Sequence, residues 1–129
     1  MDLPKNERTF DFNAVGDNFG KAYNGTFTVR CVLNIFERRL LELEKSKLRS
    51  DIVNPTPDLI ALTTILANLR LRVKEAPEWW KQSNGGDNME EENVLVELFD
   101  KVMEQETLWR KNLKSEKEEN NMGNAPKGS

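Results

Sequence analysis

Residues 54–77 read NPTPDLIALTTILANLRLRVKEAP and carry the clearest structural pattern in the chain. Leucine or valine recurs every three or four residues from Leu59 to Val73, which is the spacing of one helix face. Thr56 is a favourable N-cap because its hydroxyl can accept a hydrogen bond from the first turn, and proline is preferred at the next position. Pro77 restricts the backbone before it, so we expect the helix to end two or three residues earlier.

The chain before this helix carries two competing patterns. Apolar and polar residues alternate from Thr26 to Val32, which by itself predicts a strand. From Val29 to Leu43 the apolar residues instead recur at spacings of three and four, and this pattern continues through good helix formers. We expect the longer pattern to prevail, which gives a helix over about 27–49 with an uncertain first turn.

A third helical pattern follows the loop sequence SNGGDN at residues 83–88. Asp87 or Asn88 is the expected N-cap, and the acidic residues that come next suit the positive end of the helix dipole. The apolar stripe of this helix ends at Leu113. Beyond it the chain loses its periodicity, so we expect a disordered C-terminal tail over 114–129.

Together these patterns predict a mainly α fold, with three principal amphipathic helices in a small bundle. We divide the chain into a polar N-terminal segment over 1–24, a helical domain over 25–113 and the tail. A short β element before the first helix is compatible with this fold class. A core of this size is marginally stable alone and would gain stability from oligomerisation.

The composition of the 129 residues excludes several classes of chemistry. The chain has no histidine, which rules out Ser-His-Asp and Cys-His nucleophiles and histidine-containing zinc sites. The single cysteine, Cys31, cannot form an internal disulfide or a multi-cysteine metal cluster, and its apolar surroundings predict a buried thiol. Nineteen Lys and Arg side chains stand against 22 Asp and Glu, so we do not expect electrostatic binding to nucleic acid.

Two motifs that resemble ligand sites have simpler structural explanations. The three glutamates at 90–92 point in different directions on a helix, so they do not converge on one ion. The Asn-Gly-Gly sequence at 84–86 lacks the spacing of a phosphate-binding loop and predicts a turn. We therefore expect no catalytic residues, no cofactor and no metal site.

No stretch approaches the roughly 18 consecutive apolar residues of a membrane-spanning helix. The N-terminus, MDLPKNERTFDF, also lacks the apolar core of a secretory signal. We therefore expect no contact with a membrane. A lone cysteine without such a signal is typical of a reducing cytosol.

Trp79 and Trp80 follow Pro77 and are the most prominent aromatic pair in the chain. Adjacent side chains point apart on a helix or a strand, so we expect one tryptophan to pack on the helix before it. The other would pack on the last helix or on a partner. Core packing and interface use both remain open, because tryptophan is common in cores and in binding hot spots.

Charge is unevenly distributed along the chain. Residues 37–50 hold five cationic and three anionic side chains, a net of +2. Residues 87–106 hold eight anionic side chains and one cation, a net of −7. These segments are either ordinary solvated helix faces or complementary surfaces, in which a basic helix of one copy meets the acidic helix of another copy or of a partner.

The order of motifs resembles that of tail assembly chaperones and related minor tail or virion proteins of tailed bacteriophages. The motifs are NGTFTVR at 24–30, a long Leu/Glu/Lys helix, a proline-started apolar helix, APEWW at 76–80 and NGGD at 84–87 before an acidic helix. The resemblance covers residues 24–113. It implies a short, acidic, largely helical protein without catalytic residues, which binds an aggregation-prone virion protein such as the tape measure.

We therefore expect a non-enzymatic protein that shields or scaffolds another phage protein during tail assembly in the host bacterial cytoplasm. The expected contact residues are aromatic: Trp79, Trp80, Phe27, Phe36 and Trp109. Self-association into a homo-oligomer is also expected. The alternative is a structural virion component, a tail or head–tail connector part that forms homo-oligomeric rings and stays in the particle.

Overall fold

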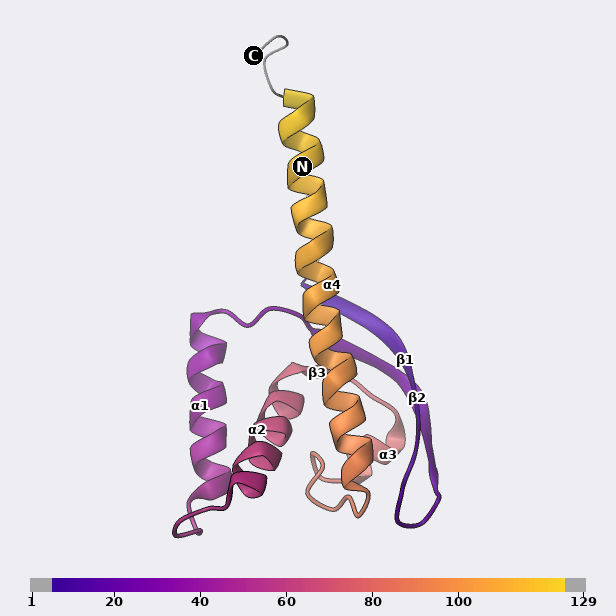
Figure 1. Ribbon diagram of the computed structural model, residues 1–129, viewed down its shortest axis with the longest axis vertical. Coiled ribbons are helices and arrows are strands. Elements are labelled where there is room, and N and C mark those ends of the chain that lie inside the picture. Colours follow the sequence, from indigo (N-terminus) through magenta and orange to yellow (C-terminus); the bar gives the residue numbers. More distant parts are fainter. Residues whose placement is uncertain (1–5, 125–129) are drawn as a thin grey trace.

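Figure 1 shows the protein as a computed structural model, which describes the backbone of residues 6–124 and the side chains up to Ser115. The elements along the chain are β1 (Glu7–Val15), β2 (Ala22–Arg30), α1 (Ile35–Arg49), α2 (Pro57–Arg72), β3 (Val73–Glu75), α3 (Glu78–Gln82) and α4 (Glu92–Asn124). The strands form one antiparallel sheet in the order β1-β2-β3. The prediction of a mainly α three-helix bundle is therefore wrong, because the protein has an α+β fold.

Strands β1 and β2 form a long hairpin whose two alternating patterns match. On one face Phe12 and Phe27 are buried, with 2% and 0% of their surface exposed. On the other face Thr9 pairs with Thr28, and their hydroxyl oxygens lie 2.8 Å apart. The helix predicted over 27–49 is wrong in its first turns, because pairing with β1 buries alternate side chains that a helix would turn in several directions.

Helix α1 begins at Ile35, directly after a capping box. The Asn34 side-chain oxygen accepts a hydrogen bond from the Glu37 backbone N–H at 2.8 Å. The Glu37 carboxylate in turn accepts one from the Asn34 backbone N–H at 3.0 Å. This exchange satisfies two backbone donors that a helix start leaves without partners, so it defines where the strand pattern ends and the helix begins.

Helix α2 confirms the helix predicted from the apolar spacing. The Thr56 hydroxyl accepts a hydrogen bond from the Leu59 backbone N–H at 3.2 Å, and Pro57 occupies the first helical position. The chain then passes from Arg72 directly into β3, which pairs antiparallel with β2. Pro77 lies just before the short helix α3, where its missing N–H costs no hydrogen bond.

Helix α4 begins at Glu92, later than the N-cap predicted at Asp87 or Asn88. Those two residues instead belong to the turns of the preceding loop, where the Asn88 backbone N–H donates to the Ser83 carbonyl at 3.0 Å. Asp87 and Asn88 therefore stabilise turns of the loop and do not cap the helix.

The far end of α4 also differs from the sequence prediction. The helix runs to residue 124, past residue 114, where we expected a disordered tail to begin. Residues 125–129 lie outside the part of the chain that the structure describes. In Figure 1 the yellow part of α4 extends well beyond the sheet.

The core lies between one face of the sheet and the helices α2, α3 and α4. Its buried apolar side chains include Phe12, Phe27 and Val29 from the strands, Leu66 and Leu69 from α2, Trp80 from α3, and Val94, Leu95, Leu98 and Val102 from α4. Helix α1 contributes no buried residue. The sheet, which the fold prediction lacked, therefore supplies a large share of the core.

Glu91 connects the turn between β1 and β2 to the start of α4. Its carboxylate is only 1% exposed and accepts hydrogen bonds from the backbone N–H groups of Asn18 at 2.8 Å and Phe19 at 2.7 Å. A Cβ atom at Gly16 would collide with the Glu91 side chain. The glycine therefore makes room for the buried carboxylate, and the carboxylate holds the turn in place.

Candidate protein-binding surface

The five predicted contact residues do not form one surface. Phe27, Trp79 and Trp80 meet inside the core, where the ring centre of Phe27 lies 5.6 Å from that of Trp79 and 6.4 Å from that of Trp80. Phe27 and Trp80 are buried and Trp79 is half-buried, so these three rings offer little surface to a partner. Trp109 is half-buried on α4, and Phe36 lies on α1 with 62% of its surface exposed.

Helix α1 carries much of the exposed apolar surface of the described residues. Ile35 and Leu43 are 78% and 65% exposed, similar to Phe36. Figure 1 shows α1 at one edge of the molecule, where it lies beside α2 and away from the sheet. Single exposed apolar residues are common on soluble proteins, but three on one helix make α1 a candidate contact surface.

We define the α1 face as the outer side of this helix. It lines a shallow hollow of about 540 Å³ and consists of Ile35, Arg38, Arg39, Glu42, Leu43 and Ser46. Within the described part of the chain, the side chains of Arg38 and Arg39 make no hydrogen bond and no ion pair. The face thus combines apolar side chains with two guanidinium groups whose donors are available, a composition that suits an apolar partner with acidic groups.

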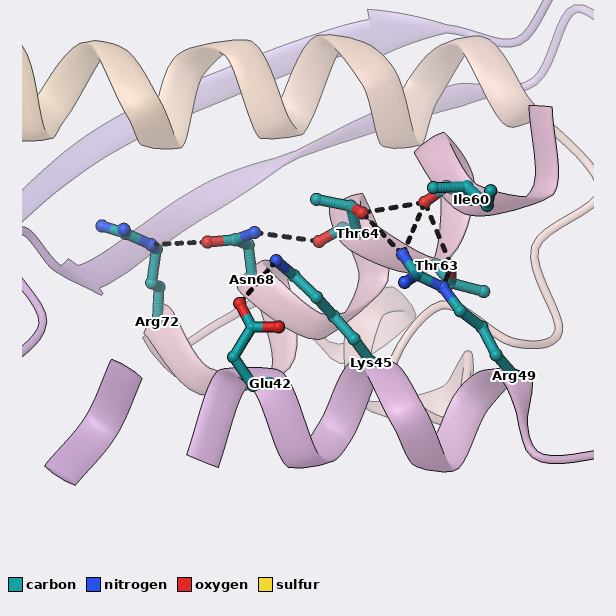
Figure 2. Close-up of polar contacts among 8 residues, drawn as sticks. All are labelled: Glu42, Lys45, Arg49, Ile60, Thr63, Thr64, Asn68 and Arg72. Atoms are coloured by element: carbon teal, nitrogen blue, oxygen red, sulfur yellow. Dashed lines mark hydrogen bonds and ion pairs between the residues drawn. The ribbon is translucent and has the colours of Figure 1, made fainter. Parts of the chain in front are cut away.

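Polar contacts fix the inner side of α1 to α2. Figure 2 shows Arg49 of α1 reaching α2, where it donates hydrogen bonds to the Thr63 hydroxyl at 2.7 Å, the Thr64 hydroxyl at 2.9 Å and the Ile60 carbonyl at 2.9 Å. The attachment of α1 therefore does not require its apolar side chains on the outer side, which remain exposed.

Arg70 of α2 forms a second anchor between helices and loop. Its guanidinium lies 2.8 Å from the Glu44 carboxylate of α1 and 2.7 Å from the Asp87 carboxylate of the loop before α4. Burial lowers the pKa of Arg70, but hydrogen bonds to Glu44 and Asp87 outweigh it, so the pKa is raised overall. The two carboxylates therefore favour the charged form of the guanidinium.

Arg72 and Cys31 form a buried polar contact between α2 and the end of β2. The Arg72 guanidinium donates to the Cys31 carbonyl at 2.6 Å and, as Figure 2 shows, to the Asn68 side chain at 3.2 Å. Burial lowers the pKa of Arg72, and the nearby Glu106 carboxylate opposes that shift. Burial also raises the pKa of the Cys31 thiol, which confirms the buried cysteine and makes a thiolate nucleophile unfavourable.

Two searches of the described residues concern other kinds of site. Across residues 6–115, whose side chains the structure describes, no group of three or more His, Cys, Asp or Glu side chains is arranged to hold a metal ion. In the same part of the chain, no helix combines the length and apolar character needed to span a bilayer.

Comparison with known proteins adds no assignment. No protein-family model, no curated protein and no solved structure matches this chain. The candidate site therefore depends on the geometry and charge of α1 alone.

Sequence reasoning named Phe36 as the only contact residue within α1. It treated the apolar residues from Val29 to Leu43 as one helical stripe, although Val29 belongs to β2. On α1 itself, Leu48 packs against the core whereas Ile35 faces solvent. Apolar residues on two sides of one short helix were the available signal for a second contact surface.

Proposed function

We propose that this chain is a non-enzymatic protein-binding protein and that the α1 face is its contact surface. The observation that carries the proposal is the exposed apolar set on α1, together with the two arginines that lack partners among the described residues. A partner would bury Ile35, Phe36 and Leu43 and supply carboxylates to Arg38 and Arg39. Burial of apolar area would provide affinity, and the charges would provide specificity and faster association.

The motif order described from the sequence supplies the setting of the proposal. Tail assembly chaperones bind virion proteins that would otherwise aggregate, and an exposed apolar helix beside basic groups is suited to that task. The proposed partner is therefore a tail or tape-measure-like protein of a bacteriophage, bound in the host cytoplasm during assembly.

A site-specific cross-link tests this proposal. A photo-reactive amino acid is placed at Leu43, and infected cells that produce the chain are irradiated. We expect a covalent product with a virion protein, because Leu43 lines the hollow of the α1 face and is exposed. The matched control carries the same photo-reactive group at Thr26, which is exposed on the open face of the sheet.

Two outcomes would contradict the proposal. The first is the absence of any protein cross-link from Leu43, and the second is the same set of products from Leu43 and Thr26. Mass spectrometry of purified particles then separates the two roles, since an assembly chaperone is absent from mature virions whereas a structural component is retained.

A further inference from the structure

A second surface of the molecule has the opposite charge to the α1 face. We call it the acidic face, and it combines the turn between β1 and β2 with the solvent side of α4. Its acidic residues are Asp17, Glu92, Glu97, Asp100 and Glu104, and all of them are exposed. Val15, Phe19 and Val96 are also exposed beside them, at 58%, 70% and 39%. This face therefore has the apolar and acidic character that the α1 face requires of a partner.

The acidic face has a defined shape that hydrogen bonds hold in place. Asp17, Glu92, Val96 and their neighbours line a hollow of about 650 Å³. Asn93 holds the two elements together, because its side chain accepts from the Asp17 backbone N–H at 2.9 Å and donates to the Val15 carbonyl at 2.9 Å. The buried Glu91 carboxylate fixes the same turn, so little ordering entropy would be lost on binding.

The charges on this face are available to a partner. Within the described residues, the carboxylates of Asp17, Glu92 and Asp100 make no side-chain hydrogen bond and no ion pair. Glu92, Val96 and Asp100 follow one another at intervals of four, so they lie along the same side of α4. Val96 thus lies between two anionic side chains. The arrangement is complementary in charge to the α1 face, where Leu43 lies beside two arginines.

We propose that the α1 face of one copy docks on the acidic face of a second copy of this chain. This contact goes beyond the proposed function, because it places a second copy of the chain, and not a virion protein, on the same α1 face. In Figure 1 α1 forms the left edge of the molecule, whereas the turn between β1 and β2 lies at the lower right. One copy can therefore engage two neighbours at once, and head-to-tail contacts of this kind generate a ring or an open filament.

The alternative contact between two copies, α1 face against α1 face, is less favourable. It would bring Arg38 and Arg39 of both copies together, and like charges at an interface oppose association. The head-to-tail contact instead pairs each guanidinium with a carboxylate, so charge selects the orientation.

Two charge-reversal variants test the contact. The first, Arg38→Glu with Arg39→Glu, damages only the α1 face. The second, Glu92→Arg with Asp100→Arg, damages only the acidic face. Lys74→Glu with Lys81→Glu is the matched control, because both lysines are exposed and lie on β3 and α3, outside the two surfaces. Mass in solution is measured by light scattering during gel filtration, and circular dichroism verifies that each variant folds.

We expect the unmodified chain and the lysine control to form species larger than a dimer at low salt. Each face variant alone is expected to be a monomer. An equimolar mixture of the two face variants should associate beyond a dimer again, because the intact surfaces pair with each other and the two reversed surfaces are also complementary in charge. Raising the ionic strength from about 0.05 M to about 0.5 M should weaken association at least about tenfold, since the range of the charges shortens.

Other results overturn the inference. A monomeric unmodified chain at low salt would remove it, as would a mixture of face variants that fails to associate. Both leave the proposed function standing if the Leu43 cross-link still captures a virion protein. Conversely, self-association with no cross-link to a virion protein would support the head-to-tail contact and contradict the role in phage assembly.

Discussion

The sheet–α4 half of the molecule and the α1–α2 pair are held together by different interactions. In the first half Phe27, Leu98 and Val102 expose 0% of their surface. In the second, α1 has no buried residue, and Arg49 and Arg70 connect it to its neighbours. The sheet and α4 are stabilised by removal of apolar surface from water. Helix α1 is joined to α2, which is itself part of the core, by hydrogen bonds and ion pairs and by Leu48 packing against the core.

This difference separates stability from binding. A fully buried large apolar side chain contributes about 1.5–3 kcal/mol, whereas a typical hydrogen bond adds about 1 kcal/mol net. The free energy of unfolding should therefore depend mostly on the sheet and α4. The contacts that attach α1 to α2 do not bury the apolar side chains on its outer side. Those side chains are therefore available to a partner.

The largest effect should come from the substitution Phe27→Ala. The side chain is fully buried and contacts the rings of Phe12, Trp79 and Trp80. Loss of its apolar contacts and the cavity left behind should lower the free energy of unfolding by about 3–5 kcal/mol. Urea denaturation followed by tryptophan fluorescence measures the change. A loss below about 1 kcal/mol, typical of a surface site, would show that the hairpin is not part of the core.

The next effect in size should come from Glu91→Gln, which tests how the turn is held. The amide retains one oxygen acceptor but presents an NH₂ group to a backbone N–H donor. With two hydrogen bonds to a buried charge affected, we expect a loss of about 1.5–3 kcal/mol. Glu92→Gln is the matched control, because Glu92 is exposed and should change stability by less than about 0.5 kcal/mol. Equal losses in the two variants would contradict the anchoring role of Glu91.

A smaller and pH-dependent effect is expected for Glu37→Gln at the start of α1. Burial raises the pKa of Glu37, but hydrogen bonds from the Asn34 backbone and from Arg30 outweigh it, so the pKa is lowered from 4.5. A lowered carboxylate pKa stabilises the fold above the unfolded-state pKa, and the contribution is lost as the pH falls through the folded-state value. We expect a loss of about 0.5–1 kcal/mol at pH 7. Unfolding curves should converge with those of the unmodified chain below pH 4.5, and a difference that persists in acid would point to the capping box rather than to charge.

The smallest effect on stability is expected for Leu43→Ser. Leu43 is 65% exposed, so its replacement should change the free energy of unfolding by less than about 0.5 kcal/mol. Binding to a partner should nevertheless weaken about tenfold or more, because the substitution removes exposed apolar surface from the α1 face. Thermal unfolding and a titration with the partner measure the two effects. A large drop in melting temperature would show that Leu43 is part of the core. It would contradict the distinction between a stabilising half and a binding helix.

Local sequence patterns predicted the elements that depend on local interactions. Helix α2 follows from its leucine spacing, and its start at Thr56 depends on a single hydroxyl three residues from its partner. The burial of Cys31 likewise follows from its apolar neighbours. These features need no information about distant parts of the chain.

The sheet could not be predicted in the same way. Strand β2 carries visible alternation, but its pairing with β1 joins residues such as Thr9 and Thr28 that are far apart in sequence. The helical spacing that continues beyond β2 competed with the strand pattern. Tertiary packing favours the strand over the helix here, since α4 covers the apolar face of the hairpin.

The candidate site was harder to predict than the fold. Aromatic side chains are favoured both in cores and at interfaces, so Phe27, Trp79 and Trp80 could not be assigned from the sequence alone. The structure places the three rings together in the core and leaves Phe36 exposed on α1. The exposure of Phe36 depends on which side of α1 meets α2, and no local pattern determines that choice.

The first strand of the chain depends on the last helix, and this has a consequence for biogenesis. Arg8 in β1 donates a hydrogen bond to the Gln105 side chain of α4 at 2.9 Å, across 97 positions of sequence. A ribosome synthesises the hairpin early, yet the helix that covers Phe12 and Phe27 emerges much later. Until translation has passed α4, the nascent chain exposes an aromatic sheet face to the cell, which is the kind of intermediate that aggregates or recruits folding helpers.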